Sequence, residues 1–403
     1  MPTRAQVCTW IAAVGLLVPS IVAGQDRTER EVVELIVRDG PLARAIRAET
    51  EVTRREQLAR LAYPNPLLTY SREGAGFTEF VQAEQSLPIF GVRAALARAG
   101  ASATAIAEAE RDVRLWQLRS EAATAVARLI AEQARHDYSQ ALIREIERLI
   151  EVLRTREREG EGSRFDRVRA EQELRETQQI VTAAAAAVVD ARAMLAGMLP
   201  AGMSVTRIAP AVDTPPLPGT RDALLSRATD ARAELRALQQ SVQRATLEAD
   251  AARRARRPSP TVFGGLKRAD ASEGRETGGV IGLSASVPLF DTGNREAARW
   301  SAEAARIEAE RGAIEQRIRE EVAGAFESLS LRQAALAQDQ PTAADELVQI
   351  AEVAYREGEV GILELLDSVR TAARARMRTI ELRSNVRLAQ VTLERAVGET
   401  LWP

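Results

Sequence analysis

Two acidic side chains near the end of the chain have the type and the spacing to act together. Glu364 and Asp367 follow the turn "EGEVG" and are three residues apart, which places both carboxylates on one face of a helix. An earlier turn, "EGEGS", is followed by one acid, Asp166. The segment from Ser163 to Asp166 reads as a capping box, and Gly361 with Glu364 approximates one. Acids in a first turn also complement the helix dipole, so the residues alone predict helix capping.

Other residues that carry chemistry are sparse. The sequence has no nucleophile–base pair, phosphate-binding loop, cofactor motif or metal-ligand cluster, and the net charge of −2 gives no indication of nucleic-acid binding. His136 is the single histidine, on a predicted coiled-coil helix; packing is the expected role, and a metal site built from three copies is the alternative. We therefore expect a protein that is not an enzyme and that has no cofactor.

The first 24 residues resemble a secretory signal peptide. Arg4 precedes an apolar run from Trp10 to Val22, and small residues follow at Ala23 and Gly24. An amino-terminal membrane anchor is the alternative. Cleavage near residue 24 would remove Cys8, the single cysteine. No later stretch was expected to reach the roughly 20 apolar residues of a transmembrane helix, so a membrane-spanning part would consist of strands.

The remaining chain is predicted to contain the same series of secondary-structure elements twice. Residues 25–200 form the first predicted repeat and residues 221–403 the second, separated by a Pro-rich linker at 201–220. Equivalent motifs recur at offsets of about 194 to 200 residues, which indicates an internal duplication. The first repeat is predicted to contain a helix at 26–62, a hairpin at about 65–88, a long helix at 91–157 and a helix at 164–198. The second is predicted to contain a helix at 221–257, a hairpin at about 259–290, a long helix at 295–356 interrupted at Pro341, and a helix at 362–397.

The long helices and the hairpins predict a mainly α protein with a small β part. Leu118, Ala122, Ala125 and Leu129 alternate spacings of four and three, which is typical of a coiled-coil seam. In the second hairpin, apolar Ile281, Leu283, Ala285, Val287 and Leu289 alternate with Gly and Ser, as in a strand of a membrane β-barrel or any half-buried strand. Four strands per chain do not close a wide barrel, whereas three chains supply twelve. The hypothesis is an exported trimer; a soluble periplasmic coiled-coil adaptor or scaffold is the alternative.

Several motifs then resemble a known family. Four motifs are similar to the TolC family of outer-membrane efflux channels, especially the heavy-metal efflux type. They are "NPLLTY" before the first hairpin, "QSLPIFG" and "VPLFDTGNREAA" before the long helices, and "AYREGEVGILELLDSVRTA". The resemblance covers nearly the whole chain after the leader. It implies a homotrimer with a twelve-stranded barrel in the outer membrane of a Gram-negative bacterium and a helical tube in the periplasm. It also implies docking to a periplasmic adaptor and an inner-membrane pump of the RND type.

The resemblance assigns roles to the two turns. It places them at the periplasmic tip, where the adaptor binds, so that Gly160, Gly162, Ser163, Gly358 and Gly361 are expected to contact the adaptor. It makes Glu364 and Asp367 gate carboxylates, which around a threefold axis form two acidic rings that bind cations. Asp166 occupies the corresponding place in the first turn, and a bond from Tyr355 to a carboxylate is expected to hold the tip closed. Val360 departs from the family, which often has a basic residue there; either part of the closing network is missing, or Arg164 or Arg356 replaces it.

One basic run remains outside this scheme. The segment "RRARR" at 253–257 precedes the second hairpin. A solvated helix end near the membrane interface is the expected reading, and contact with lipid phosphate is the alternative.

Overall fold

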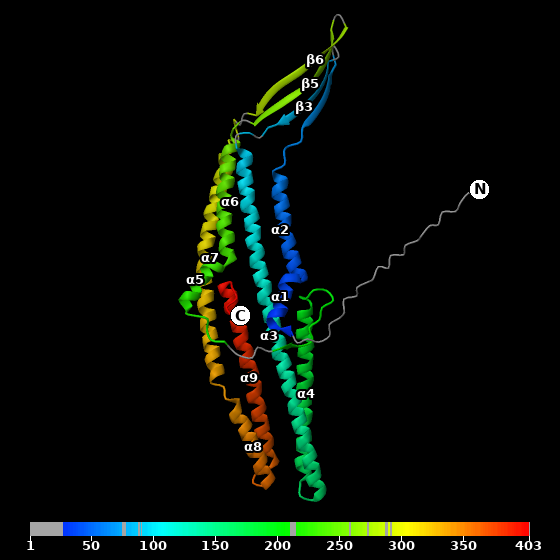
Figure 1. The fold of residues 1–403 in the computed structure, drawn as a ribbon, viewed down its shortest axis with the longest axis vertical. Helices are drawn as coiled ribbons and strands as arrows, with labels where there is room; N and C mark the ends of the chain where they lie inside the picture. The colour runs from blue at the N-terminus through cyan, green and yellow to red at the C-terminus, as the bar shows by residue number, and fades with distance from the viewer. Residues whose placement is uncertain are drawn as a thin grey trace, which may run out of the picture.

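The molecule is elongated, with a sheet at one end and two helical turns at the other (Figure 1). The computed structural model describes residues 27–402 except 75–77, 88, 90, 210–214, 258, 272–273, 287–288 and 291. The predicted signal peptide at residues 1–24 lies outside the described residues. Helices run from the sheet toward the middle of the molecule and from the middle toward the turns.

The predicted order of elements occurs twice. The first series is α1 Glu29–Asp39, α2 Pro41–Arg60, β2 Leu67–Glu73, β3 Thr78–Ser86, α3 Val92–Glu159 and α4 Arg164–Ala196. The second is α5 Arg221–Ala231, α6 Ala233–Ala255, β5 Ser259–Ala271, β6 Gly274–Ser286, α7 Asn294–Ala337, α8 Pro341–Glu357 and α9 Ile362–Val397. A short parallel pair, β1 Arg27–Thr28 with β4 Ile208–Ala209, was not predicted and ties the linker to the start of the first series.

The first helix of each series is broken where one continuous helix was predicted. In the first series Gly40 ends α1 and precedes Pro41. A Cβ atom on Gly40 would overlap the carbonyl oxygen of Ile36, so only glycine fits this junction. In the second series Arg232 adopts an extended conformation between α5 and α6, with φ −65° and ψ 110°. No Gly or Pro marks this second break, because the side-chain contacts of Arg232 stabilise it.

The long helix of the second series is interrupted as predicted, although α3 is continuous over 68 residues. α7 ends at Ala337, and Pro341 starts α8. Between them, the carboxylate of Asp339 accepts hydrogen bonds from Thr379 and from Arg378, the latter at 3.1 and 3.2 Å. These bonds hold the pKa of Asp339 below its usual value, Thr379 being the larger cause. The break is therefore fixed against α9.

The four long strands form one antiparallel sheet in the order β2-β3-β5-β6. β3 pairs with β5, which joins the two series, and the outer strands β2 and β6 have a free edge in this chain. The register sets which side chains share a face: Tyr70 is opposite Val81, Val81 is opposite Leu266, and Val262 is opposite Leu283. One face therefore collects apolar side chains from all four strands.

Three apolar clusters lie along the helices. One joins α1 and α2 to α3 and the end of α4 around Ile36 and Leu129, and a second joins α5 and α6 to α7 and α9 around Leu224 and Leu329. The third lies near the two turns and is described below. Val391 of α9 belongs to the first cluster and Leu393 to the second, so these two clusters lie at the same level, and the rod is held together there and near the turns.

One helix contradicts an expectation from the sequence. α4 has an 18-residue window of mean hydropathy 1.4, so by length and composition alone it is apolar enough to cross a membrane. The expectation that no such stretch follows the leader was wrong for α4, whose alanines and valines raise the mean hydropathy of the window. Only 11% of that window is buried within the chain. Ile180, Val189 and Met194 are exposed on it.

Candidate functional site

The two turns farthest from the sheet have matching backbones. Gly160 ends α3 with φ 81° and Gly358 ends α8 with φ 78°, a left-handed conformation that favours glycine. A Cβ atom on Gly162 would lie 2.9 Å from the Cβ of Arg156, so the first turn is closely packed. Both turns reverse the chain within a few residues and present their backbone at the end of the molecule (Figure 1).

The helix starts after these turns differ from the predicted capping boxes. The Ser163 hydroxyl accepts a hydrogen bond from the Phe165 amide at 3.1 Å, and Gly361 has no side chain to cap α9. Among the described residues, the carboxylates of Glu364 and Asp367 accept no hydrogen bond. The capping-box interpretation was wrong for Gly361 and Glu364, because a capping box needs a side-chain hydroxyl at the cap residue. Glu364 still lies in the first turn of α9.

Glu364 and Asp367 share an exposed face of α9. Ile362, Leu365 and Leu366 occupy the opposite, buried face. The Asp367 side chain is 75% exposed, and its nearest cation, the Nη2 atom of Arg374, lies 4.0 Å away. Both carboxylates therefore face away from the core of the chain with little compensation by positive charge.

The predicted tyrosine–carboxylate bond is present between α8 and α4. The Tyr355 hydroxyl donates to Oδ2 of Asp166 at 3.0 Å, and the guanidinium of Arg156 lies 5.5 Å from the centre of the Tyr355 ring. Burial and the hydrogen bond to Asp166 raise the pKa of Tyr355 to about 12. Because its pKa is raised, the phenol stabilises this contact fully below pH about 10, its usual pKa, and loses that effect as pH rises toward about 12.

A second bond between the hairpins was not predicted. Arg370 of α9 donates from Nε to Oε1 of Glu173 on α4 at 3.0 Å and from Nη2 to Oε2. The hydrogen bonds to Glu173 raise the pKa of Arg370, so its guanidinium stays charged. Within the described chain neither Arg164 nor Arg356 forms an ion pair, so their replacement of a basic residue at Val360 stays a prediction. Arg370, ten residues after Val360, supplies a basic partner on α9.

An apolar cluster lies between these two bonds. Ile146, Ile150 and Leu153 of α3 pack with Ile362, Leu365 and Leu366 of α9, with Ala170 of α4 and Ala351 of α8 completing the set. Tyr355 packs against the same cluster. The two helical hairpins therefore meet in a small apolar core with one polar bond from Tyr355 and another from Arg370.

No group of three or more His, Cys, Asp or Glu side chains is placed to hold a metal ion within the described part of the chain. The Nε2 atom of His136 lies 3.2 Å from the side-chain amide of Gln140 on the same helix, and its Nδ1 atom lies 3.8 Å from Asp137. These neighbours suit the predicted packing role better than a ligand role.

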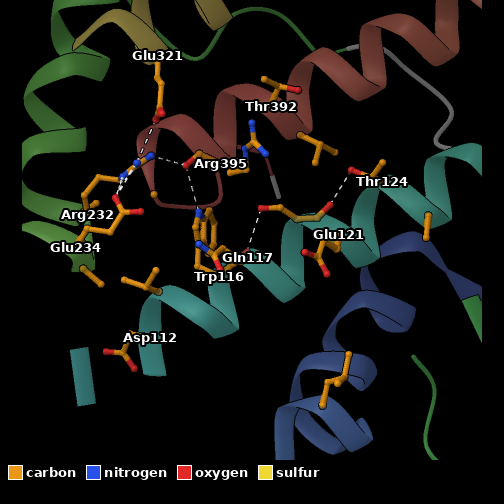
Figure 2. Close-up of a pocket in the computed structure, with 18 of the residues that line it drawn as sticks. Asp112, Trp116, Gln117, Glu121, Thr124, Arg232, Glu234, Glu321, Thr392 and Arg395 are labelled. Atoms are coloured by element: carbon orange, nitrogen blue, oxygen red, sulfur yellow. Dashed lines mark hydrogen bonds and ion pairs between the residues drawn. The ribbon is translucent and has the colours of Figure 1, made fainter. Parts of the chain in front are cut away.

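A recess lies at the middle of the rod, away from the turns. It has a volume of about 960 Å³ and lies between α3, the α5–α6 junction and the end of α9 (Figure 2). The buried Arg232 donates to the carbonyl oxygens of Arg395 at 3.0 Å and Ala396 at 2.9 Å. It also pairs with Glu234 at 2.7 Å and Glu321 at 3.1 Å. These contacts satisfy the last carbonyls of α9, so we interpret the role of Arg232 as structural: it holds the α5–α6 junction against α7 and the end of α9.

Replacing Arg232 with Ala should destabilise the protein by about 2–3 kcal/mol, because buried hydrogen bonds to a charged group are lost together with both ion pairs. The measurement is urea unfolding of the detergent-solubilised protein, followed by helical circular dichroism. Arg236→Ala is the matched control, since that side chain is 57% exposed and 3.9 Å from Asp112. Equal stability of the two variants would contradict the structural role.

Comparison with known proteins agrees with this architecture. Residues 224–399 match the family model described as outer membrane efflux protein. The fold is similar to that of the outer membrane channel MtrE of Neisseria gonorrhoeae, with TM-score 0.72, 18% identity, and coverage of 93% of this chain and 90% of that one. It is also similar to the Campylobacter jejuni outer membrane channel CmeC, with TM-score 0.73, 12% identity, and coverage of 98% and 94%. The Vibrio cholerae outer membrane protein VceC gives TM-score 0.70, 17% identity, and coverage of 93% and 97%. No curated protein matches the sequence significantly.

The sheet, the long helices and the two turns have the fold of solved outer membrane channels. The match to the outer membrane efflux protein model lies within the second series of elements, from α5 to α9. The structural likeness extends the same architecture over the first series. The alternative of a soluble periplasmic scaffold is not favoured.

Proposed function

We propose that three copies of this chain form the outer-membrane conduit of a tripartite efflux system. The conduit conducts passively what an inner-membrane pump, of the RND type, delivers through a periplasmic adaptor. One observation carries this proposal: the strand register gathers the exposed apolar side chains of the sheet on a single face.

The composition of the two sheet faces supports a membrane-spanning wall. Exposed apolar residues on one face are Leu68, Tyr70, Val81, Val262, Leu266, Ile281 and Leu283, with Leu67 as the exception on the other. Ile281 is 87% and Leu283 is 69% exposed, which is costly in water. The opposite face contains Thr69, Gln82 and Ser284. An apolar face toward lipid and a polar face toward a lumen are what a barrel strand requires.

The free edges of the sheet support assembly. β2 and β6 each have one unpaired edge, and unpaired backbone groups are not tolerated in hydrocarbon. Pairing β6 of one copy with β2 of the next satisfies both edges, and three copies close a barrel of twelve strands. The exposed apolar face of α4 fits the same assembly. It lies beside α3, away from the sheet, so a neighbouring copy covers it and no lipid is needed (Figure 1).

The turns are the proposed contact with the adaptor. The two turns lie at the end of the molecule opposite the sheet (Figure 1) and contain Gly160, Gly162, Ser163, Gly358 and Gly361. Their backbones are fixed by left-handed glycines and close packing, so a partner meets a preformed surface. The proposed gate is at the same end, where Glu364 and Asp367 face outward from α9 and the bond between Tyr355 and Asp166 joins the hairpins.

Fractionation, sizing and conductance together test this function. We expect the protein in the outer-membrane fraction, extracted only by detergent, running as a trimer and forming channels in planar bilayers. A monomer in the soluble periplasmic fraction would refute the conduit and restore the scaffold alternative.

A further inference from the structure

A group of arginines lies where the helices end and the strands begin. Arg253, Arg256 and Arg257 are at the end of α6, and β5 starts at Ser259. Arg295 is in the first turn of α7, which follows β6. We call Arg253, Arg256, Arg257 and Arg295 the basic collar. All four are exposed.

The three helix ends that carry or adjoin this collar meet closely. A Cβ atom on Gly293, the cap of α7, would overlap the carbonyl oxygen of Ala252 in α6. A Cβ atom on Gly91, the cap of α3, would lie 3.0 Å from Nη1 of Arg254. α3 and α7 both begin here, and the positive dipole ends of the two helices add to the charge of the collar.

Acidic neighbours do not neutralise the collar. Asp250 pairs with Arg254 at 3.0 Å, and Glu296 pairs with Arg299 at 2.6 Å. Glu248 is buried and holds Arg60. Within the described residues, the four collar side chains form no hydrogen bond or ion pair. Their positive charge is therefore available to a partner outside the chain.

Exposed apolar side chains accompany the collar at the same level. Leu289 is 75% and Phe290 is 100% exposed just after β6. Tyr63, before β2, is 62% exposed, and the guanidinium of Arg93 stacks 3.6 Å from the centre of its ring. Aromatic rings with arginines at the end of membrane strands are typical of the headgroup layer of a bilayer.

We propose that the basic collar binds the phosphate groups of anionic phospholipids in the leaflet that adjoins the helical part. This inference rests on the proposed function, since it requires that the strands cross a membrane. Arginine matches phosphate with paired donors, and an anionic membrane surface attracts each nearby basic residue. Leu289 and Phe290 insert beside the headgroups and hold the arginines at the depth of the phosphates.

The test compares two triple variants of the full protein with wild type. Arg253→Gln, Arg256→Gln and Arg257→Gln together remove most of the collar. The control is Arg144→Gln, Arg148→Gln and Arg319→Gln, three exposed arginines on α3 and α7 away from the sheet. Each protein is first reconstituted in phosphatidylcholine vesicles. It is then titrated in detergent with phosphatidylglycerol or phosphatidylcholine, and bound lipid is counted by native mass spectrometry.

Wild type and the control should bind phosphatidylglycerol more tightly than phosphatidylcholine, and the collar variant should lose at least about ten-fold of that preference. High salt, about 1 M, should abolish the preference in wild type because the Debye length falls to about 3 Å.

Unchanged preference for phosphatidylglycerol in the collar variant overturns the proposal. So does a change in the ion selectivity of conductance without a change in lipid binding, because the arginines would then line the lumen. Failure of wild type to enter phosphatidylcholine vesicles refutes instead the membrane-spanning function.

Discussion

Replacing Glu364 with Gln and Asp367 with Asn should weaken the block of conductance by divalent cations by about ten-fold or more. Two unit charges about 4 Å apart attract by about 1 kcal/mol even in water. A divalent ion among three or more carboxylates around an axis gains several times that energy. The substitutions keep the shape of each side chain and remove only its charge. The measurement is the cation concentration that halves single-channel conductance in planar bilayers.

The control for this gate experiment is Glu320→Gln with Glu327→Gln. Both control residues are exposed acids on α7, far from the turns, so the net charge changes equally. We expect block to stay within about two-fold of wild type in the control. If the Glu364 and Asp367 variant is blocked as strongly as the control, the two acids serve only the helix dipole.

Breaking both bonds between the hairpins should open the channel. Tyr355→Phe with Arg370→Gln removes the donor to Asp166 and the donors to Glu173. For half-buried pairs we assign about 1 kcal/mol to each bond, so the ratio of open to closed tips should rise by about 30-fold for each chain. The measurement is mean conductance per reconstituted trimer. Because Tyr355 keeps its proton, wild-type conductance should not change through this bond below pH about 10.

A matched pair of variants separates gating from general loosening. Arg376→Gln removes an arginine bound to Asp345, but that ion pair joins α8 to α9 within one hairpin. Tyr138→Phe removes a hydroxyl from another partly buried tyrosine, on α3. These controls should leave conductance near the wild-type value. Equal opening in both double variants would show that the bonds between hairpins have no special role.

The sequence predicted elements better than it predicted side-chain pairs. Periodicity and turn residues located the hairpins, both turns and the break at Pro341, because Gly and Pro act locally. The break at Arg232 has no local signal, since distant contacts with α7 and α9 produce it. β5 extends to Ala271 and β6 starts at Gly274, so the strands occupy most of the hairpin predicted at 259–290. Pairing lengthens strands through residues whose own preference is weak.

At the candidate site, the family resemblance led to Tyr355 and Asp166, whereas Glu173 was overlooked. The sequence does contain a pattern that includes Glu173. Spacings of four and three mark the buried seam of α4, which contains Asp166, Ala170, Glu173 and Thr177. A glutamate in such a seam needs a cationic partner. Its identity, Arg370, is 197 residues away and depends on how the two hairpins meet.

The break between α7 and α8 has a mechanical consequence. α3 is a single strut of 68 residues whose hydrogen-bond ladder resists bending along its whole length. The corresponding helix of the second series is interrupted between Ala337 and Pro341, whereas α9 runs past this level without a break. The bonds from Arg378 and Thr379 to Asp339 therefore act as a clamp that transmits load from α7 through α9 to the lower part of the second hairpin.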